Sequence, residues 1–182
     1  MSRYNDYVSF ASFTIKENLT IVKYCLETPK RKNTDSCYGM SALILLSSIV
    51  DTIGTFYRTG QYQTITIEEI CNEDLTSVKN HFVKYHNRFL SEDCEQNDFV
   101  DLFYKCARCK ATHNSVLGPQ VILTKKVDKN KHVLSKDKAG NLTIHLFELY
   151  ENVKQAFKTL QKESKQVYKP ERPISSTGST VQ

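Results

Sequence analysis

The segment from Ser36 to Arg58 restricts the fold more than any other part of this chain. Between Met40 and Ile53 it is apolar around most of the circumference that a helix would present. Such a helix must be covered on all sides, so it belongs at the centre of a domain. Its longest apolar run contains serines, ends at Asp51 and is too short to cross a bilayer. We therefore predict a central helix whose most buried side chains include Leu43, Leu46, Ile49 and Ile53.

Four further segments carry apolar residues at three- and four-residue steps, which is the spacing of one helix face. They cover residues 4–26, 76–90, 97–116 and 146–167. Strand-like runs lie at Val121–Thr124 and Leu142–Ile144, and residues 137–141 have the composition of a turn. The sequence therefore predicts a mainly all-α fold, an antiparallel bundle of about five helices with a small β-hairpin before the C-terminal helix.

The chain has 182 residues, which is enough for one domain with a substantial core. We expect this helical domain to cover residues 1–167. Residues 168–182 are poor in apolar side chains, so we expect a disordered tail. No signal-peptide pattern follows Met1, and the six cysteines are then best interpreted as buried thiols rather than disulfides. We expect a cytoplasmic protein that does not associate with membranes.

The chemically most distinctive stretch runs from Leu102 to Gly118 and contains Arg108 and His113. A guanidinium is a permanent charge suited to a phosphate, and an imidazole can transfer a proton near neutral pH. A pair of this kind suits phosphodiester cleavage without a metal. On a straight α-helix the two side chains would point about 140° apart. They could meet across a bend or across a symmetric contact between two copies of the chain.

A structural interpretation of the same residues is also open. Arg108 could be a solvated helix residue, and His113 could lie in a last turn, where a cation interacts favourably with the helix dipole. Asp51 lies inside the apolar helix, so its carboxylate must be paired, hydrogen-bonded or directed into a cleft. It could equally serve only to hold a neighbouring helix.

The order of these features resembles the HEPN superfamily. The resemblance rests on the helical domain, on the apolar helix with Ile-Val-Asp at residues 49–51, and on an arginine followed after four residues by a histidine, Arg108 and His113. It implies a helical bundle that forms a homodimer through residues 108–117, with a composite cleft and no metal or cofactor. Many such proteins are endoribonucleases of toxin–antitoxin or anti-phage systems. Arg108 would then hold phosphate, His113 would act as general acid and base, and Asn114 and Asp51 would orient them.

The superfamily motif usually has a polar residue directly after the arginine, and this chain has Cys109 there. That difference supports an alternative, a non-catalytic dimeric module for protein interaction or RNA binding. Either protein would have an antitoxin or a regulatory protein as a further partner.

Basic residues point to RNA as a partner without requiring it. The formal net charge is +5, and residues 125–138 contain six lysines and two aspartates. We therefore expect phosphate contacts from five lysines: Lys110, Lys125, Lys126, Lys129 and Lys131.

Cys106 and Cys109 have the C-x-x-C spacing of a redox pair or of half a zinc site. No βαβ pattern surrounds them, and a zinc site would need Cys71, Cys94 and His113 to converge, so this interpretation ranks last. His81 and His86 are five residues apart, which does not fit a helical metal site, and we expect them at the surface or at the edge of the core.

Overall fold

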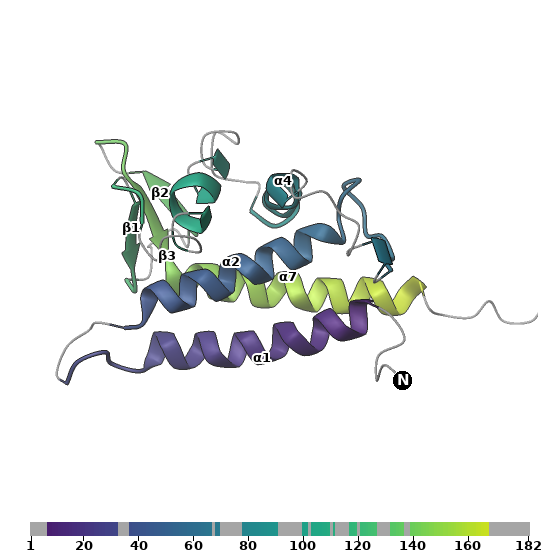
Figure 1. The fold of residues 1–182 in the computed structure, drawn as a ribbon, viewed down its shortest axis with the longest axis horizontal. Coiled ribbons are helices and arrows are strands. Elements are labelled where there is room, and N and C mark those ends of the chain that lie inside the picture. Colours follow the sequence, from purple (N-terminus) through teal and green to yellow (C-terminus); the bar gives the residue numbers. More distant parts are fainter. Residues whose placement is uncertain are drawn as a thin grey trace, which may run out of the picture.

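The fold is mainly α-helical, with a small sheet before the last helix (Figure 1). The structure is a computed structural model, and it describes residues 7–32, 37–66, 68–69, 78–90, 100–101, 103–109, 111, 117–119, 121–126, 132–136 and 139–167. Its elements are α1 (Tyr7–Glu27), α2 (Gly39–Thr55), α4 (Val78–Phe89), the π-helix η2 (Phe103–Cys109), β1 (Val121–Thr124), β2 (Leu134–Lys136), β3 (Leu142–His145) and α7 (Leu146–Val167).

Three long helices, α1, α2 and α7, lie side by side (Figure 1). Helix α1 runs opposite to the other two, and α2 and α7 run in the same direction (Figure 1). Helix α4 packs on α2, and η2 also contacts α2. Helix α2 therefore has neighbours on several sides, as its apolar circumference requires.

The predicted central helix is confirmed. Leu43, Leu46 and Ile53 of α2 are completely buried, and Ile49 is 1% exposed. The helix is shorter than expected, because it ends at Thr55 and continues only as a turn to Thr59. Backbone amides of Phe56 and Tyr57 bond three residues back, which tightens and closes the last turn. Gly60 then adopts a positive φ of 93°.

The sheet differs from the predicted hairpin. Strand β3 is central and pairs in parallel with β1 and antiparallel with β2. Gly140 of the predicted turn has a positive φ of 83°, but in the chain it lies between β2 and β3 rather than between β1 and β3. The two predicted strands do pair, but in parallel. The strand that forms the hairpin was missed because Leu134–Lys136 is only three residues long and has a single buried side chain, too short for an alternating pattern.

The remaining helix predictions have mixed outcomes. Helix α7 has the expected bounds, and α1 and α4 lie within two residues of the predicted ends wherever those ends are described. The expectation of one α-helix over 97–116 was wrong for Phe103–Cys109, which is π-helical. The tail at 168–182 lies outside the described residues. Within the described part of the chain, no helix has both the length and the apolar character needed to span a bilayer.

Candidate functional site

Asp51 lies near the C-terminal end of α2 and faces α4. Its Oδ1 atom is 2.9 Å from Nδ1 of His81, which is 3% exposed. Oγ1 of Thr55, one turn later on α2, is 3.2 Å from the same nitrogen and donates a hydrogen bond to the Asp51 carbonyl. Because both oxygens therefore accept from the imidazole, Nδ1 of His81 carries a hydrogen. The side chain of Asp51 thus has the buried polar partner that its position requires.

A glycine allows α4 to approach α2 this closely. A Cβ atom on Gly54 would lie 2.2 Å from the carbonyl oxygen of His81 and 2.7 Å from its carbonyl carbon. Any side chain at this position would push the two helices apart, since the obstacle is backbone and not a movable side chain. Gly54 therefore determines the short distance between His81 and Asp51.

The second carboxylate oxygen of Asp51 contacts Arg108, the residue predicted to bind phosphate. Nη2 of Arg108 lies 3.3 Å from Oδ2 of Asp51, and the Arg108 side chain is 19% exposed. The two residues come from η2 and α2, which are 57 positions apart in the sequence. A carboxylate between an imidazole and a guanidinium holds both in fixed positions, and the Asp51 contact occupies one of the five guanidinium N–H donors.

The π-helix places a tyrosine under the same guanidinium. The Arg108 guanidinium carbon is 5.5 Å from the centre of the Tyr104 ring, a cation–π distance. The Tyr104 ring packs at 5.2 Å against Phe82 of α4, which also contacts Phe103 at 5.8 Å. These rings fix η2 on α4, so the position of Arg108 is set from two sides. π-helical turns occur frequently at functional sites.

Tyr104 is electrostatically linked to its surroundings. Burial raises the pKa of its hydroxyl, and the neighbouring Cys109 and Asp51 raise it further, while Arg108 acts in the opposite direction. The hydroxyl therefore keeps its proton at neutral pH. Cys109 is a free cysteine with a partly buried side chain.

The structure brings together two of the predicted site residues, Asp51 and Arg108. His113, Asn114, Lys110, Lys129 and Lys131 lie outside the described residues. We call the group formed by Asp51, Thr55, His81, Tyr104 and Arg108 the Asp51 cluster.

The sequence pattern did not indicate His81, Thr55 or Tyr104 as site residues. The placement of His81 and His86 at the surface or the edge of the core was wrong, since both are buried. Their five-residue spacing directs them to different sides of α4, one toward α2 and one toward the sheet. The sequence feature that could have indicated a buried partner such as His81 is Asp51, because a carboxylate in an apolar helix needs a buried donor.

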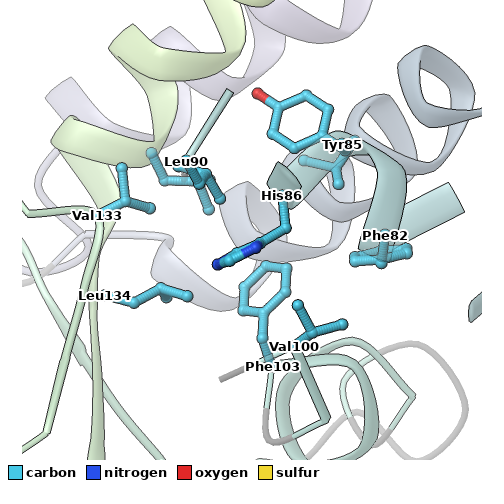
Figure 2. A pocket seen from close by; sticks show the side chains of 10 residues that line it. Phe82, Tyr85, His86, Leu90, Val100, Phe103, Val133 and Leu134 are labelled. Carbon is cyan, nitrogen blue, oxygen red and sulfur yellow. The ribbon is translucent and has the colours of Figure 1, made fainter. Parts of the chain in front are cut away.

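His86 lines a small apolar cavity of about 20 Å³ between α4 and β2 (Figure 2). Its ring extends from α4 toward Leu134 and Phe103 (Figure 2). The cavity is large enough for about one water molecule. Burial lowers the pKa of His86, and the side chain of Asn87 offsets this in part. The folded protein therefore favours the neutral form of this imidazole.

Lys125 and Lys126 follow β1 and lie away from the Asp51 cluster. They line an open groove of about 610 Å³ together with Cys37, Gly39, Met40, Leu123, Thr124 and Leu146. Asp51 lies 12 residues beyond Gly39 on α2, a distance of about 18 Å along the helix. A polyanion would have to extend over this distance to contact both places.

No group of three or more potential metal-ligating side chains occurs among the residues that the structure describes. The zinc hypothesis depends on Cys71, Cys94 and His113, which lie outside them. Comparison with protein-family models, with curated proteins and with solved structures gives no match. The fold thus defines a mainly α-helical domain.

Proposed function

We propose that the protein is a cytoplasmic, metal-independent endoribonuclease of the HEPN type. The observation that carries this proposal is the contact between Arg108 and Asp51. Both were selected from the sequence as site residues on separate helices, and they lie 3.3 Å apart in a largely buried polar cluster. An arginine positioned by a carboxylate and by a tyrosine ring is ready to bind a phosphate without reorganisation, which is the main requirement for electrostatic stabilisation.

The proposed reaction requires two roles. The RNA 2′-hydroxyl attacks the adjacent phosphorus, the 5′-oxygen leaves, and a 2′,3′-cyclic phosphate forms. Arg108 stabilises the charge that develops on the phosphate oxygens, and His113 transfers the proton. Asp51 orients the guanidinium, and Asn114 has the corresponding role for the histidine. Two copies of the chain form the cleft through residues 108–117, and an antitoxin or regulatory protein controls it.

The test is cleavage of a mixed single-stranded RNA pool by the purified full chain in the presence of a chelator. We expect products that end in a 2′,3′-cyclic phosphate, and we expect DNA to survive because it lacks the nucleophile. Replacing His113 by Ala should slow cleavage by roughly 10²–10⁴-fold. Replacing Arg108 by Ala should slow it by about 10²–10³-fold.

Lys105→Ala is the matched control, because Lys105 is an exposed cation in the same π-helix and pairs with Asp101 rather than with Asp51. Its cleavage rate should equal that of the wild type. Equal cleavage by wild type and His113→Ala would assign the activity to a contaminant. A wild type that binds RNA or a partner protein but cleaves nothing would instead identify the non-catalytic module, which Cys109 favours.

A further inference from the structure

Ser135 and His145 form a hydrogen-bonded pair on the sheet, outside the Asp51 cluster. Nε2 of His145, the last residue of β3, is 3.0 Å from Oγ of Ser135 on β2. Strand pairing sets this contact, because Ser135 lies opposite Thr143, and His145 follows Thr143 by two positions. Residues two apart on a strand point to the same face, so the serine and the histidine are diagonal neighbours on one face of the sheet.

The other ring nitrogen of His145 defines where the hydrogen atoms lie. Nδ1 is 3.1 Å from the backbone carbonyl oxygen of Lys126. A carbonyl can only accept, so Nδ1 donates, and in the neutral imidazole Nε2 then carries the lone pair. The Ser135 hydroxyl therefore donates to Nε2. In this arrangement a histidine can remove the proton of a serine while a third group holds the ring in place.

The base of this pair is buried and the nucleophile is within reach of solvent. His145 is 8% exposed, and its backbone amide donates to the carbonyl oxygen of Val133 at 3.0 Å. The ring is thus fixed both through its own backbone and through the Lys126 carbonyl. Ser135 is only half-buried, so a substrate can approach its hydroxyl.

The pair lies at the edge of the open groove that follows β1. Lys126, whose carbonyl holds His145, lines this groove, and so does Leu146, the residue after His145. The lining combines the cations of Lys125 and Lys126 with apolar side chains such as Leu123 and Leu146. A small ester with an apolar acyl chain and a negative charge matches this combination.

We propose that Ser135 is the nucleophile of a hydrolase site for carboxylic esters of this class. Oγ of Ser135 attacks the ester carbon while its proton passes to Nε2 of His145. The bond from that carbon to the alcohol oxygen then breaks, and the imidazolium returns the proton to the leaving oxygen. Water attacks the acyl-serine in the same way, giving its proton to Nε2, and the acid leaves as Ser135 regains a proton. This activity uses no residue of the Asp51 cluster and goes beyond the proposed nuclease.

The first experiment treats the purified full chain with a fluorophosphonate, a reagent for activated serines. The serine oxygen bonds to phosphorus and fluoride leaves. We expect one adduct, which peptide mass spectrometry should locate on Ser135, and we expect none in Ser135→Ala. Ser164 is the internal comparison, because its hydroxyl donates to the carbonyl of Gln161 rather than to a histidine. It should stay unlabelled.

The second experiment measures hydrolysis of two nitrophenyl esters with acyl chains of equal length, one of which ends in a carboxylate. The wild type should hydrolyse both, and the charged ester about 2–5-fold faster at low salt. His145→Gln keeps a polar side chain but removes the base, so both rates should fall by roughly 10²–10⁴-fold. Thr143→Val is the control, because Thr143 carries a hydroxyl directly opposite Ser135. Its rates should equal those of the wild type.

The variant Ser135→Ala separates loss of chemistry from loss of folding. Ser135 is half-buried and on a short strand, so its replacement should leave the melting temperature unchanged, whatever the stability of His145→Gln. A wild type without an adduct, an adduct at another residue, or esters that Ser135→Ala hydrolyses at the wild-type rate would each overturn the proposal. Equal rates for the two esters would overturn the assignment of a charged substrate. None of these readouts depends on RNA cleavage.

Discussion

At the scale of single residues, the main constraint is that a polar side chain inside an apolar helix needs hydrogen-bond or ion-pair partners. Asp51 could be recognised in the sequence as a carboxylate that needs partners, and it has two, His81 and Arg108. The identity of His81 could not be derived, because it depends on how closely α4 approaches α2. A pattern along one helix contains no information about the neighbour that its polar residue meets.

The buried His86 leads to a prediction on pH. Its folded-state pKa is lowered by burial, so below about pH 6.5 the unfolded chain binds a proton that the folded protein does not. The free energy of unfolding should therefore fall as the pH decreases from 7 through 6.5 toward the folded-state pKa. Replacing His86 by Leu removes this contribution, and urea unfolding at pH 5.5 and 7.5 should show a smaller difference than in the wild type.

The residues around His86 allow its effect on the pH dependence of stability to be measured separately. Among the described residues that line the cavity, Tyr85 is the only other titratable one, and its hydroxyl donates to Asn152 at 2.7 Å. Burial raises the pKa of Tyr85, so it stays neutral throughout the range. His132→Leu is a control for simple loss of a histidine, because His132 does not line the cavity. An unchanged pH difference in His86→Leu would contradict the prediction.

At the scale of elements, periodicity predicted long regular helices well and irregular ones poorly. The bounds of α7 and the central position of α2 followed from their apolar patterns. The π-helix did not, since a change from four- to five-residue hydrogen bonding is decided by packing of Phe103 and Tyr104 on Phe82. The strand at Leu134–Lys136 and the parallel direction of β1 against β3 were missed for a similar reason, because strand pairing depends on contacts distant in sequence.

The close contact of α2 and α4 leads to a prediction on stability. Replacing Gly54 by Ala places a methyl group against the His81 backbone, so the helices must separate. We expect a net loss of about 1–3 kcal/mol, although alanine alone would favour the helix, and a melting temperature lower by about 2–12 °C. Calorimetry would measure the change.

Gly39→Ala offers the comparison. Its new Cβ would meet the end of the Leu146 side chain at 3.0 Å, and that side chain can rotate away. The stability of this variant should stay within about 1 kcal/mol of the wild type. If Gly54→Ala lost no more stability than Gly39→Ala, α4 would not lie as close to α2 as the structure shows.

At the scale of the whole molecule, the Asp51 cluster and the groove lined by Lys125 and Lys126 lie at different positions along α2. For the proposed RNA contact, replacing both Lys125 and Lys126 by Gln should weaken binding and reduce the salt dependence. The slope of log affinity against log salt should become shallower by about 1.4, at 0.7 for each lost contact with single strands. Fluorescence anisotropy with a labelled RNA at several salt concentrations would measure it.

A second double variant separates local contact from net charge. Lys16 and Lys23 are exposed on α1, and replacing both by Gln removes the same charge on another element. The salt slope of this variant should match the wild type. An equal change in both double variants would mean that RNA responds only to overall charge, and the groove would lose its proposed role.

The position of α7 also affects how the protein is made. Helices α1 and α2 are complete once residue 55 has been synthesised, but α7, which packs on both, ends only at residue 167. At 5–20 residues per second the ribosome needs roughly 6–22 s for this interval. During that time the apolar surface that α7 later covers is exposed on the nascent chain. Biogenesis of this domain should therefore depend on a chaperone that shields the α1–α2 hairpin until translation reaches the last helix.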